Sequence, residues 1–255
     1  MNKRLAVGML VFILAAGAAS ANLLSFRLSY FVPHLKGDFW DIEFENMAFK
    51  KSSFYDVSFG VQYETFLTRG FSLLVAFDLF RKNKGSYYTN WVGYYFNDGT
   101  AFAFPASEFK GAFDPNHSIS ISSAPLQASI KWTPLGRRGN IIPYVGGGGH
   151  VMFWNIKMQG AMIDFDVPYV YEDEYGEVTV YQIFDVNARE SDGIGRVSFG
   201  WQAFGGVMIP IGRRMTVDIG GQYFSCPAKF ENAFTNFESL DAGGFQFSLG
   251  LNYWF

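Results

Sequence analysis

The chain has 255 residues, of which 49% are hydrophobic and 19% aromatic, and its formal net charge at pH 7 is −3. This slight excess of acidic side chains argues against a nucleic-acid partner, because binding to phosphates needs a surplus of Lys and Arg. Cys226 is the single cysteine, so an internal disulfide is excluded and stability must come from other sources.

The N-terminal segment has the pattern of a secretory signal peptide. Two cations precede an apolar run, which ends in small residues at Ala19 and Ala21. A positive start, an apolar centre and a small-x-small end are the features that signal peptidase recognises. We therefore expect cleavage before Asn22, with residues 1–21 as the signal peptide and residues 22–255 as the mature domain.

No segment of the sequence predicts a helix that stays in a membrane. The apolar run at the start has about 15 residues, whereas a spanning helix needs roughly 20. No later stretch approaches that length without a charge, Gly or Pro. Asn at position 22, where a lipoprotein would have Cys, argues against a lipid anchor; an uncleaved N-terminal anchor is the alternative.

Apolar and polar residues alternate with a period of two along much of the chain, which predicts strands. In the last strand the large apolar side chains share one parity, and Gln246, Ser248 and Asn252 lie on the other. One face suits lipid and the other suits a polar lumen. Eight strands are predicted in this way, at residues 24–32, 55–66, 71–82, 118–133, 143–155, 196–209, 215–224 and from 243 to the C-terminus.

The strand at 118–133 changes phase along its length. Ile119 is apolar at an odd position, whereas Ile130 and Trp132 are apolar at even positions. One extra residue in a strand reverses which face each later side chain takes, and Pro125 cannot donate to a ladder. We therefore expect a β-bulge near residues 123–125.

The connections between the predicted strands divide into two classes. Three are short, at 66–71, 133–142 and 210–214, and four are long, at 35–54, 82–117, 155–195 and 225–242. With both termini in the periplasm, the short turns fall on one side and the long loops on the other, as in outer-membrane barrels. The third long loop alternates on both sides of a turn near 173–176, which predicts a hairpin above the membrane. Insertion of this hairpin, giving ten strands, is the alternative, but its acidic residues suit lipid poorly.

Three stretches resemble the small outer-membrane β-barrel domain family, which includes the OmpA-, OmpX- and OmpW-type barrels. They are residues 26–33, the Pro-Tyr-Val-Gly run that begins at Pro143, and residues 249–255 with their terminal aromatic. The resemblance implies an all-β, transmembrane, antiparallel up-and-down barrel of about eight strands in the outer membrane of a Gram-negative cell. It further implies that lipids and lipopolysaccharide surround it, and that the barrel assembly machinery reads a signal to which Tyr253 and Phe255 correspond.

Four charged residues stand on the inward parity of their strands, near the periplasmic ends. They are Arg27, Glu64, Lys131 and Asp218. Because an eight-stranded barrel is just wide enough to be filled by its own side chains, two cations and two anions can form an ionic cluster that plugs the lumen. A narrow selective pore is the alternative.

Catalytic and metal-binding signals are weak, so we expect no enzyme activity, cofactor or metal. A lipid-modifying barrel of the deacylase type needs a His two residues from a Ser, and none of His34, His117 and His150 has one. His34 with Asp38 is a formal alternative at the rim. Between residues 155 and 195 lie nine acidic and two basic residues, but without a calcium-loop pattern they read as a solvated loop rather than a Ca²⁺ site.

The first two long loops are unusually aromatic. The aromatic residues are Phe39, Trp40, Phe44, Phe49 and Phe54 in the first loop, and Tyr87, Tyr88, Trp91, Tyr94, Tyr95, Phe96, Phe102, Phe104, Phe109 and Phe113 in the second. Some would form the outer aromatic girdle and others a lid over the barrel mouth. The alternative is a mouth that binds an apolar or carbohydrate ligand, resembling how OmpW-type barrels pass small hydrophobic molecules into the bilayer.

Together these features predict a non-enzymatic barrel with a plugged lumen and a structural or surface-interaction role. Transport of small hydrophobic solutes is the first alternative, and it predicts a lateral gap near Pro125. An outer-membrane lipid-modifying enzyme is the second, and it predicts a His beside a Ser or an Asp at the rim.

Overall fold

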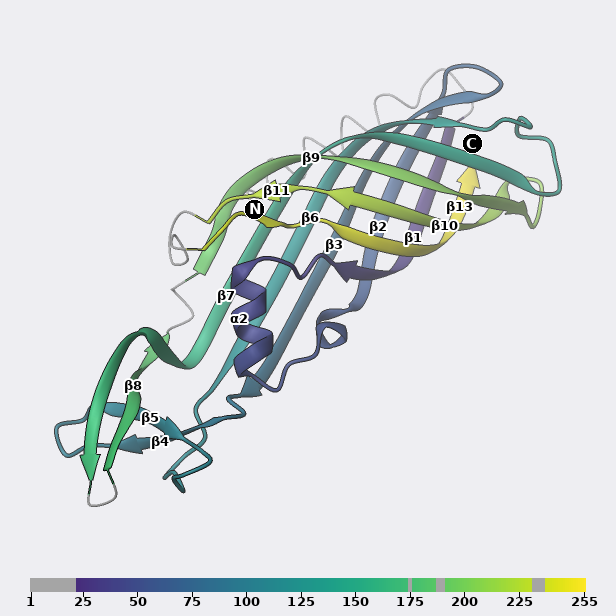
Figure 1. The fold of residues 1–255 in the computed structure, drawn as a ribbon. Coiled ribbons are helices and arrows are strands. Elements are labelled where there is room, and N and C mark those ends of the chain that lie inside the picture. Colours follow the sequence, from purple (N-terminus) through teal and green to yellow (C-terminus); the bar gives the residue numbers. More distant parts are fainter. Residues whose placement is uncertain (1–21, 174–175, 187–190, 231–236) are drawn as a thin grey trace.

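Eight antiparallel strands form a closed barrel in the computed structural model, which describes residues 22–173, 176–186, 191–230 and 237–255 (Figure 1). In barrel order they are β7 (Ile142–Asp173), β6 (Asn116–Trp132), β3 (Phe71–Tyr87), β2 (Asp56–Phe66), β1 (Asn22–Pro33), β13 (Gly244–Trp254), β10 (Met215–Ser225) and β9 (Ser191–Pro210). Pairing of β7 with β9 closes the sheet. The all-β fold and its eight strands are therefore confirmed.

The predicted cleavage site falls at the edge of the described residues. Ala19 and Ala21 lie outside them, and Asn22 is the first residue of β1. No helix within the described ranges combines the length and the hydropathy needed to cross a membrane.

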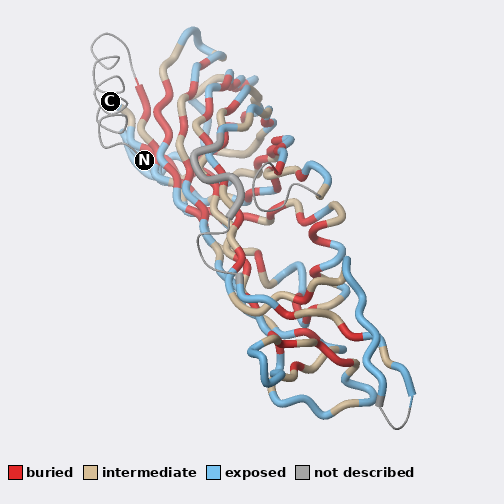
Figure 2. The backbone as a smooth tube through the Cα atoms, turned by 90° about the vertical axis from the view of Figure 1, so that its left-hand side faces the viewer, coloured by how far each residue is buried: buried red, intermediate tan, exposed pale blue. Residues whose placement is uncertain are grey.

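Buried and exposed residues alternate along the barrel strands (Figure 2), so alternate side chains point inward and outward, as the period of two predicts. Leu28 lies between Phe59 and Leu249 in the ladder, so three neighbouring strands present apolar groups on one face. Phe59 is 63% exposed and Phe247 is 61% exposed, whereas their inward neighbours Ser58 and Gln246 are buried. The outside of the barrel is therefore an apolar belt, and its inside is largely polar.

The predicted β-bulge near residues 123–125 is wrong. β6 keeps one register with β7 from Ser123 opposite Trp154 to Leu126 opposite Val151. Ile119 points inward and is fully buried in an apolar cluster, so the odd parity of β6 faces the interior throughout. The phase change in the sequence reflects an interior that changes from polar to apolar toward the long-loop end.

Strands β3, β6 and β7 continue past the rest of the barrel at the long-loop end (Figure 1). The chain turns back after Asp173 into β8 (Gly176–Val186), which confirms the predicted hairpin. β8 pairs with β5 (Ala101–Pro105), and β5 pairs with β4 (Trp91–Tyr95). These strands and the end of β7 form a sheet extension beyond the barrel and are not inserted into its wall. The ten-stranded alternative is therefore wrong.

Short elements of the other long loops were not predicted from the sequence. The first loop contains the helix α2 (Asp38–Asn46) and the 3₁₀ helix η2 (Lys51–Phe54). The last loop contains a small ladder between β11 (Pro227–Ala228) and β12 (Leu240–Asp241).

Candidate functional site: the barrel interior and its mouth

A buried ion pair lies inside the barrel near its short-turn end. Lys131 Nζ of β6 is 2.8 Å from Glu64 Oε2 of β2, and these residues are 1% and 0% exposed. Ser72 Oγ of β3 donates to the second carboxylate oxygen of Glu64. The ammonium of Lys131 also lies 4.4 Å from the ring centroid of Tyr144. The charges are thus held by side chains from four strands.

The other two residues of the predicted ionic cluster have different partners. Arg27 Nη2 lies 2.8 Å from Asp78 Oδ2, and Asp218 accepts a hydrogen bond of 2.7 Å from the hydroxyl of Tyr144. Arg27, Lys131 and Asp218 line one small cavity of about 20 Å³, which is room for about one water molecule. Asp78 was missed, although it stands on the inward parity of the strand predicted at 71–82.

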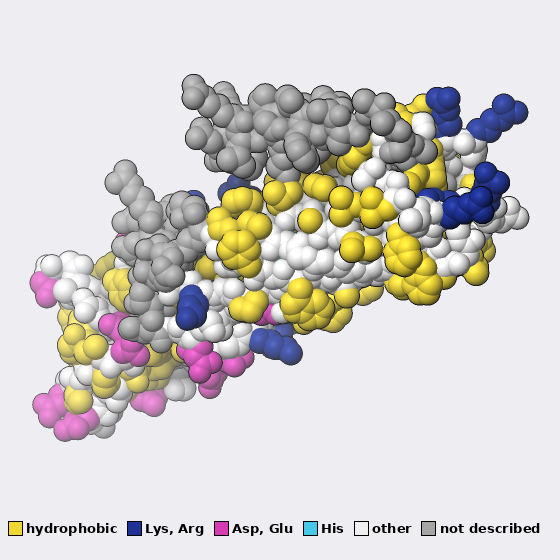
Figure 3. Space-filling view, turned by 90° about the horizontal axis from the view of Figure 1, so that it is seen from above, with side chains coloured by type: hydrophobic (Ala, Val, Ile, Leu, Met, Phe, Trp, Pro, Cys, Tyr) yellow, Lys and Arg dark blue, Asp and Glu magenta, His cyan; other side chains and the backbone are white. Residues whose placement is uncertain are grey.

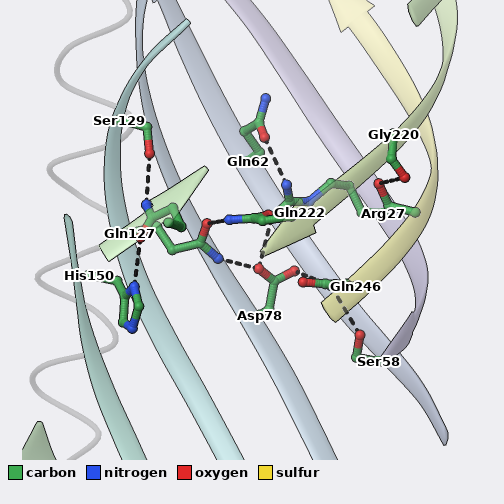
Figure 4. Close-up of polar contacts among 12 residues, drawn as sticks. Arg27, Ser58, Gln62, Asp78, Gln127, Ser129, His150, Gly220, Gln222 and Gln246 are labelled. Atoms are coloured by element: carbon green, nitrogen blue, oxygen red, sulfur yellow. Dashed lines mark hydrogen bonds and ion pairs between the residues drawn. The ribbon is translucent and has the colours of Figure 1, made fainter. Parts of the chain in front are cut away.

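Glutamine side chains cross the middle of the barrel and converge on Asp78 (Figure 4). Gln127 Nε2 donates to the carboxylate of Asp78 and accepts a hydrogen bond of 2.8 Å from Gln222. Gln246 Nε2 lies 3.5 Å from Asp78 Oδ1 and 3.1 Å from Ser58 Oγ. With Arg27, this group joins six strands of the barrel.

A second, smaller group adds the two remaining strands. Gln202 Nε2 of β9 donates to Ser129 Oγ at 2.8 Å, and Gln202 Oε1 lies 2.6 Å from His150 Nδ1 of β7. The sequence signal for these contacts is amide side chains on the inward parity, a pattern that a search for charges overlooks. The polar layer is therefore built mainly from neutral hydrogen-bonding groups.

Aromatic residues of the first long loop fill the barrel mouth. Trp40 of α2 and Phe54 of η2 are fully buried, with ring centroids 5.2 Å apart, and Phe39 packs on Trp40 at 5.0 Å. They share one apolar cluster with Ile119 and Trp154 of the barrel wall. The first loop is thus folded into the interior, as the predicted lid requires.

Aromatic residues of the second long loop pack mainly within the sheet extension. Phe104 of β5 is buried against Tyr94, Phe109 and Tyr171, at centroid distances of 5.1, 4.9 and 5.2 Å. Tyr88 belongs instead to the cluster in the mouth. The aromatic density of this loop therefore serves mostly as the core of the projecting sheet.

One hydrogen-bonded pair of polar side chains is enclosed in the apolar mouth. His117 Nε2 lies 2.8 Å from Glu43 Oε2, and both residues are buried. Burial, followed by the negative charge of Glu43, raises the pKa of the neighbouring Tyr88 hydroxyl. The pair links α2 to β6, so it fixes the position of the helix in the mouth.

His34 does not pair with Asp38. Its Nδ1 lies 2.9 Å from Asp241 Oδ2, and Asp38 instead accepts hydrogen bonds from the backbone of Phe39 and Glu238. Burial favours a higher pKa for Asp241, but hydrogen bonds from His34 and two backbone amides outweigh it, so the pKa is lowered. Among the described residues, the side-chain hydrogen-bond partner of His34 is therefore Asp241, and no Ser or Thr hydroxyl bonds to this imidazole.

In the described ranges, no three His, Cys, Asp or Glu side chains are grouped closely enough to hold a metal ion. Part of the acidic third loop, including Glu174 and Glu190, lies outside those ranges.

The sequence matches no protein-family model and shows no significant similarity to a curated protein. Solved outer-membrane proteins are similar in structure only. OprG from Pseudomonas aeruginosa is 11% identical with a TM-score of 0.49, over 93% of this chain and 96% of that one. Ail of Yersinia pestis is 11% identical with a TM-score of 0.44, over 93% and 100%. Neisserial surface protein A is 12% identical with a TM-score of 0.43, over 94% and 99%. Likeness of this extent carries no information on activity.

The class of the protein follows from its own geometry. Within the described residues each of the eight barrel strands pairs with a neighbour on both sides, and the outer face bears large apolar side chains where a water-soluble barrel would be polar. Short turns lie at one end and long loops at the other. The described chain is a small eight-stranded transmembrane β-barrel of the outer-membrane type.

Proposed function

We propose that this protein is a non-enzymatic outer-membrane barrel with a closed lumen, whose sheet extension is a surface-interaction platform. The observation that carries the proposal is the pair of layers across the interior. Hydrogen-bonded groups from all eight strands fill the middle, and the aromatic residues of α2 and η2 fill the mouth. An ion would have to break buried hydrogen bonds in one layer and displace packed rings in the other.

The orientation follows the usual arrangement of this class. The short turns face the periplasm, the long loops face outward, and the phospholipids and lipopolysaccharide of the membrane surround the belt. Tyr253 and Phe255 serve in the assembly signal; their rings pack together at 5.2 Å, and the backbone amide of Phe255 donates to Asn22. In this orientation, the end of β7 and all of β8 stand outside the membrane.

The sheet extension supports an interaction role because its strands are paired in a ladder and expose apolar groups. Its core is closed by Phe104, yet Tyr95, Val170 and Phe184 remain exposed on its surface. Exposed apolar groups on a sheet beyond the membrane are typical of a contact surface for another molecule.

Two measurements test the proposal. Purified protein in planar bilayers should show no stable single-channel conductance at neutral pH, and stable openings would refute the closed lumen. A variant with residues 91–105 and 164–185 replaced by short Gly-Ser linkers should keep the folded barrel. Cells that produce this variant should lose the binding to other surfaces that cells with the full chain show. Equal binding by this variant and the full chain would refute the platform.

Transport of small hydrophobic solutes is a second candidate, favoured by one feature of the barrel wall. The β3–β6 ladder pairs Phe77 with Leu126 and Phe80 with Ser123, and Pro125 lies in the unpaired interval between them. A small cavity of about 10 Å³ lies beside it, lined by Asp78, Phe80 and Pro125 among others. A second cavity of about 20 Å³ with apolar walls lies above it, beneath Trp40.

Uptake of a radiolabelled hydrocarbon separates the two candidates. A closed barrel gives the same uptake in producing and deletion cells. Transport gives faster uptake in producing cells, and a disulfide that bridges β3 and β6 at Leu79→Cys and Ala124→Cys would abolish the difference.

A further inference from the structure

The three short turns of the barrel repeat one pattern. In each turn an aliphatic residue stands two positions before an arginine: Leu67 before Arg69, Leu135 before Arg137, and Ile211 before Arg213. In two of the turns a second arginine follows, at Arg138 and Arg214. The segments 67–70, 133–141 and 211–214 contain no Asp or Glu. The short-turn end is therefore both basic and apolar.

The aliphatic members of the pattern are unusually exposed. Leu67, Leu135 and Ile211 are 60%, 76% and 57% exposed. They continue the apolar belt, since Phe71 and Trp132 stack at 6.4 Å on the outer wall next to the turns. Turn tips that stand in water are normally polar, so this end is better suited to a partly apolar surrounding.

The arginines have two different roles. Arg137 is folded back: Nη1 donates to the carbonyl of Thr68 at 2.8 Å, Nη2 donates to that of Phe71 at 3.0 Å, and its guanidinium carbon lies 3.8 Å from the ring centroid of Phe66. It fastens one turn to the next. Within the described ranges, Arg69, Arg138 and Arg213 are exposed and make no hydrogen bond or ion pair.

Charge is distributed unequally between the two ends of the molecule. Lys and Arg gather at the short-turn end of the barrel, whereas Asp and Glu gather at the far end of the sheet extension (Figure 3). Guanidinium groups bind phosphate oxygens in pairs, and aliphatic tips favour the boundary between headgroups and acyl chains. A phospholipid supplies both, and the excess of arginine over acidic residues in the three turns favours a headgroup with a net negative charge.

We propose that the short-turn end is a binding rim for anionic phospholipids. The aliphatic tips enter the acyl boundary of the phospholipid leaflet, and Arg69, Arg138 and Arg213 hold the headgroup phosphates. Arg137 keeps the turns in place and takes no direct part. The rim lies at the opposite end from the proposed interaction platform and needs neither its ligand nor an open lumen.

The test is competition between phosphatidylglycerol and phosphatidylcholine of identical acyl chains for the detergent-purified full chain, read by native mass spectrometry. The wild type should bind phosphatidylglycerol preferentially, and the variant Arg69→Ser/Arg138→Ser/Arg213→Ser should lose this preference. A cation near a lipid surface contributes roughly a fivefold change in affinity, so removal of all three arginines should lower the preference for phosphatidylglycerol by more than about tenfold. Heat-modifiable migration in gels verifies that each variant is folded.

Two matched variants complete the design. Lys50→Ser/Lys84→Ser/Lys110→Ser removes three exposed cations at the long-loop end and should leave the preference unchanged. Leu67→Ser/Leu135→Ser/Ile211→Ser should weaken both lipids equally. Equal binding of the two lipids by the wild type would overturn the proposal, as would a preference that survives in the arginine variant.

Discussion

Replacement of Lys131 by Met should destabilise the barrel strongly. The carboxylate of Glu64 is fully buried, and without the ammonium at 2.8 Å it keeps one side-chain hydrogen bond, from Ser72. Removing one partner of a buried ion pair costs about 3–5 kcal/mol, because the remaining charge is desolvated and uncompensated. Asp218 also loses a nearby cation, so the Lys131 variant should lie at the upper end of that range.

Replacement of the other partner, Glu64, should lower the free energy of unfolding by less. In Glu64→Leu the ammonium of Lys131 still faces the ring of Tyr144 and the charge of Asp218. The double variant Glu64→Leu/Lys131→Met carries neither charge, and similar volumes fill the space. Its free energy of unfolding should therefore lie within about 1 kcal/mol of the wild type.

The assay is urea unfolding from phospholipid vesicles, followed by tryptophan fluorescence, with all four members of the cycle compared. Lys82→Met is the matched control, because Lys82 pairs with the partly exposed Asp56 at 2.6 Å, and such pairs contribute about 0–1 kcal/mol. If the losses of the two single variants simply add in the double variant, the argument for a coupled buried pair is refuted.

Three further predictions concern packing and reactivity. Gly148→Ala should prevent folding, because a Cβ there would lie 2.0 Å from the carbonyl oxygen of Ala128. Gly149→Ala should fold, since the nearest atom to its Cβ is at 3.7 Å. Equal folding of both variants in the gel-shift assay of barrel formation would contradict this prediction. Trp40→Ala should cost about 3–5 kcal/mol locally and expose the first loop to protease, while the strands stay protected; unchanged digestion would argue against the lid. Burial, followed by the charge of Asp241, raises the pKa of Cys226 to about 12. At pH 8 the thiol of the folded protein should therefore react with a thiol reagent about a thousandfold more slowly than the thiol of the protein unfolded in urea. Comparable rates would show that the thiol is accessible in the folded protein.

The strand positions could be predicted because the membrane imposes a simple rule on each side chain. Outside the barrel every second residue meets lipid, so alternation such as that of Leu249 and Gly250 is visible without knowledge of the neighbours. The misread strand β6 shows where this rule stops. Ile119 is apolar because of the lid that covers it, and the lid comes from a loop about 70 residues earlier in the sequence, which the local pattern of β6 does not reveal.

The interior contacts were predictable in kind but only partly in detail. Parity placed Arg27, Glu64, Lys131 and Asp218 inside the barrel, but their pairing depends on the stagger between strands, which is set by closure of the sheet. Asp78 became the partner of Arg27 for that reason. The pairing of His34 with Asp241 depends on the last loop, which alternation does not constrain.

The junction between β1 and β13 has a consequence for biosynthesis. Leu23 pairs with Trp254, and the ladder runs on to Pro33 opposite Gly244, so this seam joins residues more than 200 positions apart. It cannot form until translation has passed β13. Until then both strands carry unpaired backbone groups beside apolar side chains, which is the surface that leads nascent chains to aggregate. Closure of the barrel at this seam therefore depends on the most distant pairing in the sequence, and the open chain exposes this aggregation-prone surface until β13 has been made.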